Sequence, residues 1–165
     1  MTVWWITLAS SYLLCLVAGM NAKTVYSNGY YTKKYNKFFS FMSVAILVLV
    51  AGLRSGIGDT PTYIQGYKTD APSTIAGSIK LLFSGKKDAG FYFYQGILKS
   101  IVNNPNVFIF VTSLITIVLI FITYYKYSQL LELSVFLFIT TGCYLVTMNG
   151  IRQYLASAIL FFCFP

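Results

Sequence analysis

The sequence predicts an all-α, polytopic integral membrane bundle, and three observations support this fold class. Of the 165 residues, 57% are hydrophobic and only 10% are charged, whereas soluble chains average about 25% charged residues. The mean hydropathy is +0.69. Apolar stretches recur along the chain, and some approach the roughly 20 residues that a spanning helix needs. This composition excludes an ordinary cytosolic enzyme, a disordered segment and a nucleic-acid-binding protein with a charged face.

Five membrane spans are predicted within a single domain, residues 1–165. The first has no basic residue before it, so it is interpreted as an anchor rather than a secretory signal peptide. The last two are separated only by Asn149 and Gly150, which indicates a tight helical hairpin, and the fifth stops at Pro165. The predicted spans cover residues 2–20, 38–53, 107–125, 133–148 and 151–165.

The lysines predict the orientation. The loop 21–37 contains four lysines and no acidic residue, so the positive-inside rule places it in the cytoplasm. The N-terminus, the long loop 54–106 and the Asn149 turn then lie outside, and the turn with Lys126 and Glu132 lies inside.

The long loop contains two further predicted helices. One begins at Ile75 and is stopped by Gly85, the other follows Asp88 and is ended by Asn103-Asn104-Pro105, and in each the apolar residues recur with helical spacing. Asp88 can cap the second helix. The simplest account is that both are amphipathic helices in the outer interface, where contact with the membrane alone would explain their aromatic residues.

Several kinds of site are excluded or disfavoured. The chain contains no histidine, which excludes histidine-dependent triads and the common zinc sites. Cys15, Cys143 and Cys163 lie far apart in apolar runs and are interpreted as buried filler. We expect no metal and no other cofactor. The net charge of +8 mainly sets topology and attracts anionic headgroups.

A first candidate site follows the second span and comprises Arg54, Gly56, Gly58, Asp59 and Tyr63. Glycines let the backbone turn sharply or approach a ligand. The Arg54 guanidinium suits bidentate binding of phosphate, and the Asp59 carboxylate can take a proton from a hydroxyl. The alternative interpretation is that Arg54 anchors the helix at the headgroups and Asp59 caps the next turn.

A second candidate site contains Asn149, Arg152 and Gln153. Arg152 is followed by thirteen residues without a charge, and an ionisable residue within a membrane is by default a functional-site hypothesis. The alternative is an arginine that reaches to the interface. Asp88 and Tyr92 form a third block, which adds a second carboxylate. In the predicted topology all three lie outside, and together they suit an anionic, phosphorylated, lipid-linked substrate.

In these blocks the sequence resembles the EpsG family, membrane proteins allied to the Wzy-type polymerases of exopolysaccharide, capsule and O-antigen. The order and spacing of the blocks fit the family. One departure is Asp88, where the family usually has glutamate. Because family members are longer, the chain is interpreted as an N-terminal portion. The blocks are Arg54-Ser55-Gly56-Ile57-Gly58-Asp59 with Tyr63, Asp88 with Gly90, Phe91 and Tyr92, and Asn149-Gly150-Ile151-Arg152-Gln153 with Ala156.

The resemblance implies a polymerase that joins polyprenyl-pyrophosphate-linked oligosaccharide units at the outer face of a bacterial cytoplasmic membrane. A flippase and a chain-length regulator of the same pathway are the further partners that it implies. Arg54 and Arg152 would stabilise the departing pyrophosphate, and Asp59 would be the general base. The implied substrate-binding residues are Gly56, Gly58, Tyr63, Asp88, Tyr92, Asn149 and Gln153.

Other functions are weighed against this one. A non-enzymatic transporter or flippase of lipid-linked sugars needs basic residues through both leaflets, but the predicted spans are nearly free of charge. A membrane acyltransferase that modifies polysaccharide usually relies on histidine, and this chain has none. A purely structural scaffold leaves Arg152 unexplained.

Overall fold

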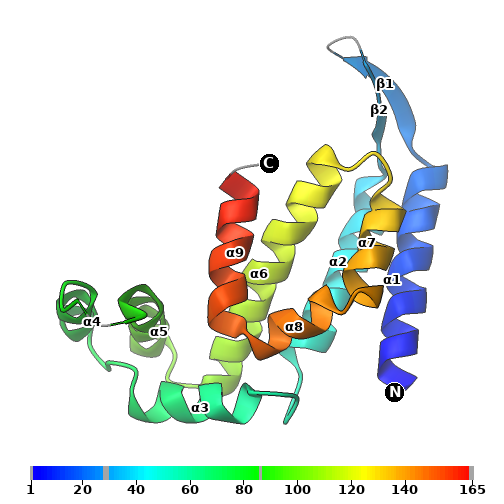
Figure 1. Ribbon diagram of the computed structural model, residues 1–165. Coiled ribbons are helices and arrows are strands. Elements are labelled where there is room, and N and C mark those ends of the chain that lie inside the picture. The colour runs from blue at the N-terminus through cyan, green and yellow to red at the C-terminus, as the bar shows by residue number, and fades with distance from the viewer. Residues whose placement is uncertain (1, 28–29, 86, 164–165) are drawn as a thin grey trace.

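The computed structural model describes residues 2–27, 30–85 and 87–163, and these form a helical bundle (Figure 1). The chain runs up and down through the bundle, so that the end of α2 and the start of α9 lie at the same end. The helices of the bundle are α1 (Thr2–Met20), α2 (Lys37–Gly52), α6 (Pro105–Tyr127), α7 (Leu131–Thr140), α8 (Cys143–Asn149) and α9 (Ile151–Cys163).

Within the described ranges, two helices are long and apolar enough to cross a membrane, and α7 with α8 makes a third candidate. They are α1, with 19 residues, and α6, with 23. The shorter α2 and α9 have 16 and 13 residues. These helices confirm the predicted helical membrane architecture, with two or three candidate spans where five were predicted. Residues 164–165, at the end of the fifth predicted span, lie outside the described residues.

Small and hydroxyl side chains form the interface between α1 and α2. The Cys15 thiol donates to Ser43 Oγ at 3.2 Å, and Ser43 Oγ donates to the Ser11 carbonyl at 3.1 Å. Small residues let membrane helices approach closely, and hydrogen bonds between helices add to the attraction. The buried residues of α1 accordingly recur on one face: Thr7, Ser11, Cys15 and Ala18.

The predicted fourth span, residues 133–148, is broken. Helices α7 and α8 are bent by 56° relative to each other. Gly142, at φ 82°, ends the regular backbone, and Thr141 Oγ1 donates to the Leu137 carbonyl at 2.6 Å. Such bonds back to the preceding turn, together with a glycine, are known causes of helix bending. The expectation of one continuous helix is therefore wrong.

A β-hairpin replaces the plain loop that was expected between the first two spans. Strands β1 (Lys23–Ser27) and β2 (Tyr30–Lys34) pair antiparallel, with Lys23 opposite Lys34. The Tyr35 carbonyl after β2 accepts a hydrogen bond of 2.9 Å from Tyr125 Oη. The hairpin is thereby tied to the end of α6, at the opposite end of the bundle from Asn149.

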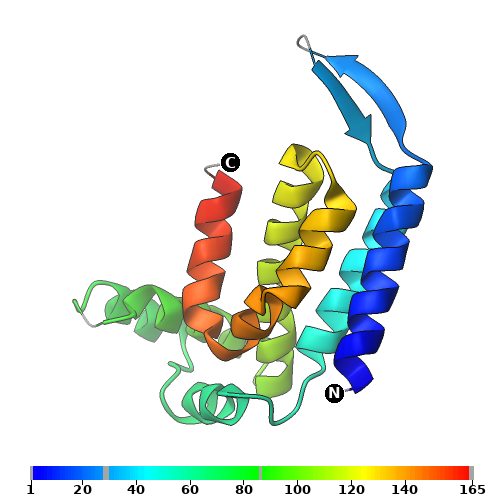
Figure 2. The same ribbon diagram turned by 45° about the vertical axis from the view of Figure 1, so that its right-hand side comes forward.

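Three helices form a ledge at the Asn149 end of the bundle (Figure 2). They are α3 (Thr60–Thr69), α4 (Ile75–Leu82) and α5 (Ala89–Ile101). Helices α4 and α5 lie where the spacing of apolar residues predicts them. Helix α3 was not predicted from the sequence, although Pro61 occupies its first turn, where proline is favoured. Gly96 lets α5 approach α4, because a Cβ there would overlap Ser78 Oγ.

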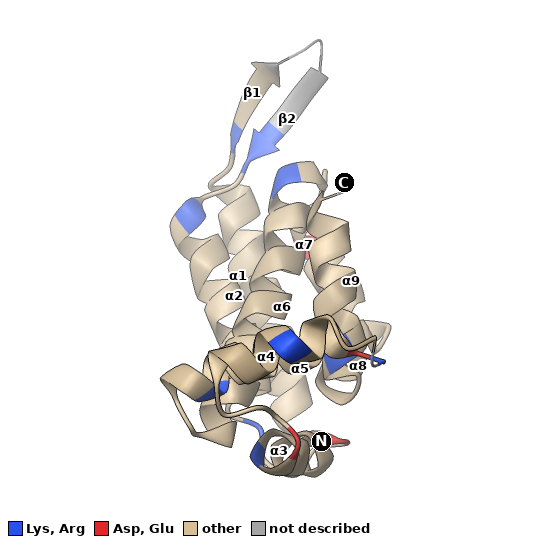
Figure 3. Cartoon of the chain, turned by 90° about the vertical axis from the view of Figure 1, so that its left-hand side faces the viewer, with Lys and Arg blue, Asp and Glu red and all other residues tan. Residues whose placement is uncertain are grey.

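Lys and Arg residues lie mainly at the two ends of the bundle and on the ledge (Figure 3). The helical stretches between carry few charged side chains. The prediction of buried cysteines holds for Cys15 only, since Cys143 and Cys163 are exposed.

Candidate functional site

The buried side chain of Arg54 forms hydrogen bonds with residues of four helices, α2, α3, α6 and α8. Its side chain is only 8% exposed. Nε donates to Thr60 Oγ1 at 3.0 Å, Nη1 to Ser113 Oγ at 2.8 Å and Nη2 to the Met148 carbonyl at 3.1 Å. Nη1 also donates to the Ala51 carbonyl at 2.5 Å. Burial lowers the pKa of Arg54 to about 10, so it remains a cation at neutral pH.

The chain between α2 and α3 turns at two glycines with positive φ. Gly56 has φ 69° and open space around it, whereas Gly58 has φ 54° and lies against Asn149. A Cβ at Gly58 would overlap Asn149 Oδ1. That oxygen is buried and has no hydrogen-bond partner among the described residues. The first and second sequence blocks therefore touch through Gly58 and Asn149.

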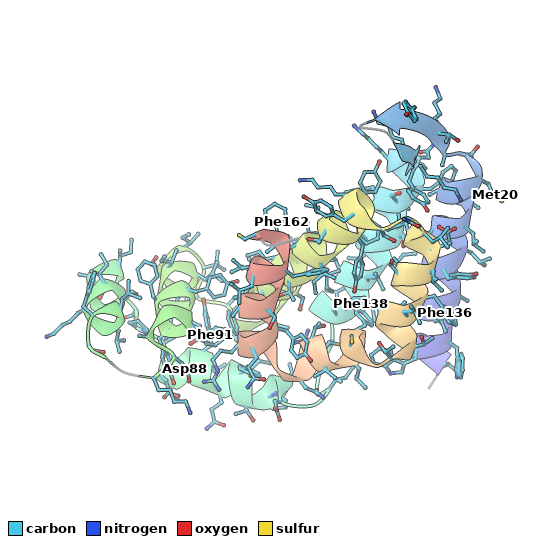
Figure 4. All side chains as sticks on the ribbon, turned by 45° about the horizontal axis from the view of Figure 1, so that its top comes forward. Met20, Asp88, Phe91, Phe136, Phe138 and Phe162 are labelled. Atoms are coloured by element: carbon cyan, nitrogen blue, oxygen red, sulfur yellow. The ribbon has the colours of Figure 1, made fainter. Side chains whose placement is uncertain are left out.

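Arg152 and Asp88 form an ion pair between α9 and the start of α5. Arg152 Nη1 donates to Asp88 Oδ2, and the two side chains are 41% and 28% exposed. Asp88 has φ 64° and makes no side-chain cap to α5, so the predicted capping role is wrong. Its carboxylate faces Arg152 instead. Figure 4 shows Asp88 and Phe91 where the ledge meets α9.

An aromatic cluster fixes the ledge to the bundle. The rings of Tyr67 and Phe108 stack with their centroids 4.7 Å apart. Tyr67 Oη also donates to the Val102 carbonyl at 2.9 Å. Phe91 packs edge-on against Phe108 at 6.1 Å, and Tyr94 Oη lies 3.0 Å from Thr112 Oγ1. These contacts place α3 and α5 in a defined position beside α6.

A polar cleft opens between α3, α5 and the start of α9. Its volume is about 320 Å³. It combines two carboxylates, one glutamine, one arginine and three aromatic rings. The residues that line it are Asp59, Thr62, Tyr63, Gly66, Asp70, Phe91, Tyr92, Gln95 and Arg152.

An apolar groove lies beside the polar cleft, between α5, α6 and α9. Its volume is about 480 Å³. Phe91 and Arg152 line both cavities, so the arginine stands where a polar environment changes to an apolar one. The residues of the groove are Asp88, Gly90, Phe91, Tyr94, Ile115, Arg152, Leu155, Ala156 and Ile159.

The structure brings some of the predicted site residues together and places others elsewhere. Asp59, Tyr63, Tyr92 and Arg152 share the polar cleft. Gly56, Gly58, Asn149 and Gln153 do not line either cavity. Arg54 borders a different cleft, formed with Asn106 and Phe110. The two arginines therefore do not face one cavity.

Sequence reasoning missed Gln95 and Asp70, which both line the polar cleft. Gln95 is 2% exposed, and its Oε1 has no hydrogen-bond partner among the described residues. A signal was present, because Gln95 is a polar residue three positions after Tyr92, on a predicted helix. Asp70 ends α3, a helix that the sequence analysis did not expect.

A model of a known protein family matches most of the chain. No curated protein and no solved structure matches the chain. The EpsG family model matches residues 37–165, which include all three sequence blocks, Arg54 to Tyr63, Asp88 to Tyr92 and Asn149 to Gln153. The chain therefore belongs to the EpsG family.

Proposed function

We propose that this protein is a membrane polysaccharide polymerase that joins oligosaccharide units carried on polyprenyl pyrophosphate. The observation that carries the proposal is the position of Arg152 between the polar cleft and the apolar groove. A lipid-linked sugar has the same order of parts, an apolar chain, a doubly charged pyrophosphate and a neutral polar sugar. The membership of the EpsG family supports this class of function.

Arg152 is the residue best placed to bind the pyrophosphate. Its guanidinium is partly exposed and lines both cavities, and a planar guanidinium binds phosphate oxygens in pairs. It lies in the first turn of α9, where the helix dipole favours an anion. The Asp88 carboxylate that pairs with Arg152 holds the place that a phosphate oxygen would take. When the substrate binds, its phosphate replaces the Asp88 carboxylate as the partner of Arg152.

Asp59 is the general base in this proposal. It is exposed and lines the polar cleft. The acceptor hydroxyl attacks the anomeric carbon of the donor sugar and forms a new C–O bond, while its proton passes to the Asp59 carboxylate. The bond from that carbon to the pyrophosphate breaks, and polyprenyl pyrophosphate leaves with the electron pair. Arg152 offsets the negative charge that develops on it.

Arg54 acts as a positioning residue in this proposal, a change from the role that the resemblance implies. Its donors are directed to Thr60, Ser113 and two backbone carbonyls. It therefore holds the start of α3, and with it Asp59, in place against α6 and α8.

The test is the length distribution of surface polysaccharide in cells that carry the gene, lack it, or carry the Arg152→Ala variant. A polymerase predicts a ladder of chain lengths that collapses to single units in the second and third strains. A transporter predicts an unchanged ladder with less material, and that result would overturn the proposal. Equal amounts of membrane-inserted protein, checked by immunoblot, serve as the control.

A further inference from the structure

We infer that the polar cleft binds the sugar that is attached to the pyrophosphate, and that Gln95 selects this sugar. The inference rests on the proposed function, and it assigns one part of the substrate to one cavity. It is carried by Gln95, which lines the polar cleft beside Arg152 and whose buried amide oxygen has no partner among the described residues.

The Gln95 oxygen needs a hydrogen-bond donor. Gln95 is 2% exposed, and its Oε1 is buried with no partner among the described residues. Buried polar atoms in native proteins are nearly always satisfied, because an unpaired one costs free energy. Gln95 lines the polar cleft, so a ligand in that cleft can supply the donor. A sugar hydroxyl or the N–H of an acetamido group has the required chemistry.

The charge of the cleft favours a neutral ligand rich in hydroxyl groups. Asp59 and Asp70 line it together with Gln95. Ionised carboxylates only accept hydrogen bonds, and they repel an anion. An anionic group therefore fits only at the Arg152 wall, and hydroxyl groups fit the remainder of the cleft.

The shape and the aromatic rings of the cleft suit one sugar ring. Its volume of about 320 Å³ is near the lower end of the roughly 300–1,000 Å³ of small-molecule sites. Tyr63, Phe91 and Tyr92 line it, and aromatic side chains present apolar faces beside polar groups. Because Arg152 and Phe91 also line the apolar groove, the sugar in the cleft would be the one next to the pyrophosphate.

The experiment compares binding of two lipids to the purified full-length protein in nanodiscs. One lipid is polyprenyl pyrophosphate. The other is the lipid-linked repeat unit extracted from host cells that lack the gene. Both compete with a fluorescent polyprenyl pyrophosphate. The variants are Gln95→Leu, the matched control Gln65→Leu on an exposed position of α3, and Arg152→Ala.

The Gln95→Leu variant separates a binding role from a structural one. Leucine removes an oxygen that has no partner among the described residues and replaces the amide side chain with an apolar one of similar size, so the folded state should lose no stability. We expect an unchanged thermal unfolding midpoint. We also expect about tenfold weaker binding of the repeat-unit lipid, as for the loss of one good hydrogen bond, with unchanged binding of polyprenyl pyrophosphate.

Each other outcome has a definite meaning. If Gln95→Leu binds both lipids as the unchanged protein does, a water satisfies the oxygen and the inference is overturned while the proposed function stands. If the variant binds both lipids more weakly to the same extent, the inference is also overturned, because Gln95 would then not contact the sugar specifically. If the unchanged protein binds neither lipid, the proposed function itself fails. Arg152→Ala is expected to weaken binding of both lipids, and Gln65→Leu of neither.

Discussion

The same residue type has two different environments in this protein. Arg152 is 41% exposed and pairs with one carboxylate. Arg54 is 8% exposed and donates to two hydroxyls and two backbone carbonyls. A guanidinium whose donors are already used holds structure together, and one with accessible donors can take a ligand. Stability and activity should therefore respond differently to the two arginines.

The first prediction concerns this difference. Arg54→Ala leaves buried acceptors without their donor, so we expect it to lower the free energy of unfolding by roughly 2 kcal/mol or more. Arg152→Ala removes a partly exposed ion pair, which should cost at most about 1 kcal/mol. Thermal unfolding in detergent measures both. A greater loss of stability in Arg152→Ala would contradict the assignment of Arg54 as the positioning residue.

The second prediction compares two glycines. Gly56→Ala and Gly58→Ala both place a Cβ at positive φ, which costs roughly 1–2 kcal/mol. Only Gly58→Ala also collides with Asn149, so it should be the more destabilising of the two. Shortening Asn149 to alanine in the Gly58→Ala background should recover part of the loss. Equal unfolding midpoints for the two glycine variants would show that Gly58 and Asn149 are not in contact.

At the scale of elements, the helices that could be predicted from the sequence are those whose own apolar residues recur with helical spacing. The apolar spacing from Ile75 and from Phe91 predicts α4 and α5. Helix α3 carries no such pattern, because its buried residues are only Thr60 and Tyr67. Arg54 and the Val102 carbonyl hold these two residues in place. Helix α3 is held in place by contacts with residues that are distant in the sequence, and a local pattern of residues cannot reveal such contacts.

The bend between α7 and α8 has a similar explanation. Residues 133–148 carry no charge and are mostly apolar, so hydropathy alone predicts one helix. The break depends on the backbone at Gly142 and on the bond from Thr141 to the Leu137 carbonyl. Threonine and glycine are both tolerated in membrane helices, so their presence did not distinguish a bent helix from a straight one.

The third prediction tests the packing of α1 on α2. Ala18 lies fully buried on the face of α1 that holds Ser11 and Cys15. Ala18→Leu overpacks this interface, and we expect it to cost roughly 1–3 kcal/mol. Ala9→Leu is the matched control, because Ala9 is exposed on the same helix. Similar unfolding midpoints for the two variants would mean that α1 does not pack through this face.

At the scale of the whole molecule, the up-and-down path of the chain assembles the site. It returns the start of α9 to the end of the bundle where α2 stops. That arrangement follows from counting spans, which is why Asp59, Tyr63, Tyr92 and Arg152 could be predicted to meet. The order of the spans does not determine how α3 and α5 face each other. The place of Gln95 in the cleft between them was therefore found only in the structure.

The fourth prediction is that the ledge and the β-hairpin lie on opposite sides of the membrane. Single cysteines are introduced for Ser73, between α3 and α4, and for Gln129, between α6 and α7, after the three native cysteines are replaced by alanine. Both positions are exposed. A membrane-impermeant maleimide added to intact cells should label Ser73→Cys at once and Gln129→Cys only after permeabilisation. The reverse pattern would invert the predicted topology.

The most direct test of the central claim is conversion of purified lipid-linked repeat units by the purified full-length protein. Release of polyprenyl pyrophosphate and the growth of longer lipid-linked products are measured together by mass spectrometry. We predict one released polyprenyl pyrophosphate for each unit added, and a loss of both products in Arg152→Ala with its fold intact. Full activity in Arg152→Ala would contradict the claim that this residue, between the two cavities, holds the pyrophosphate.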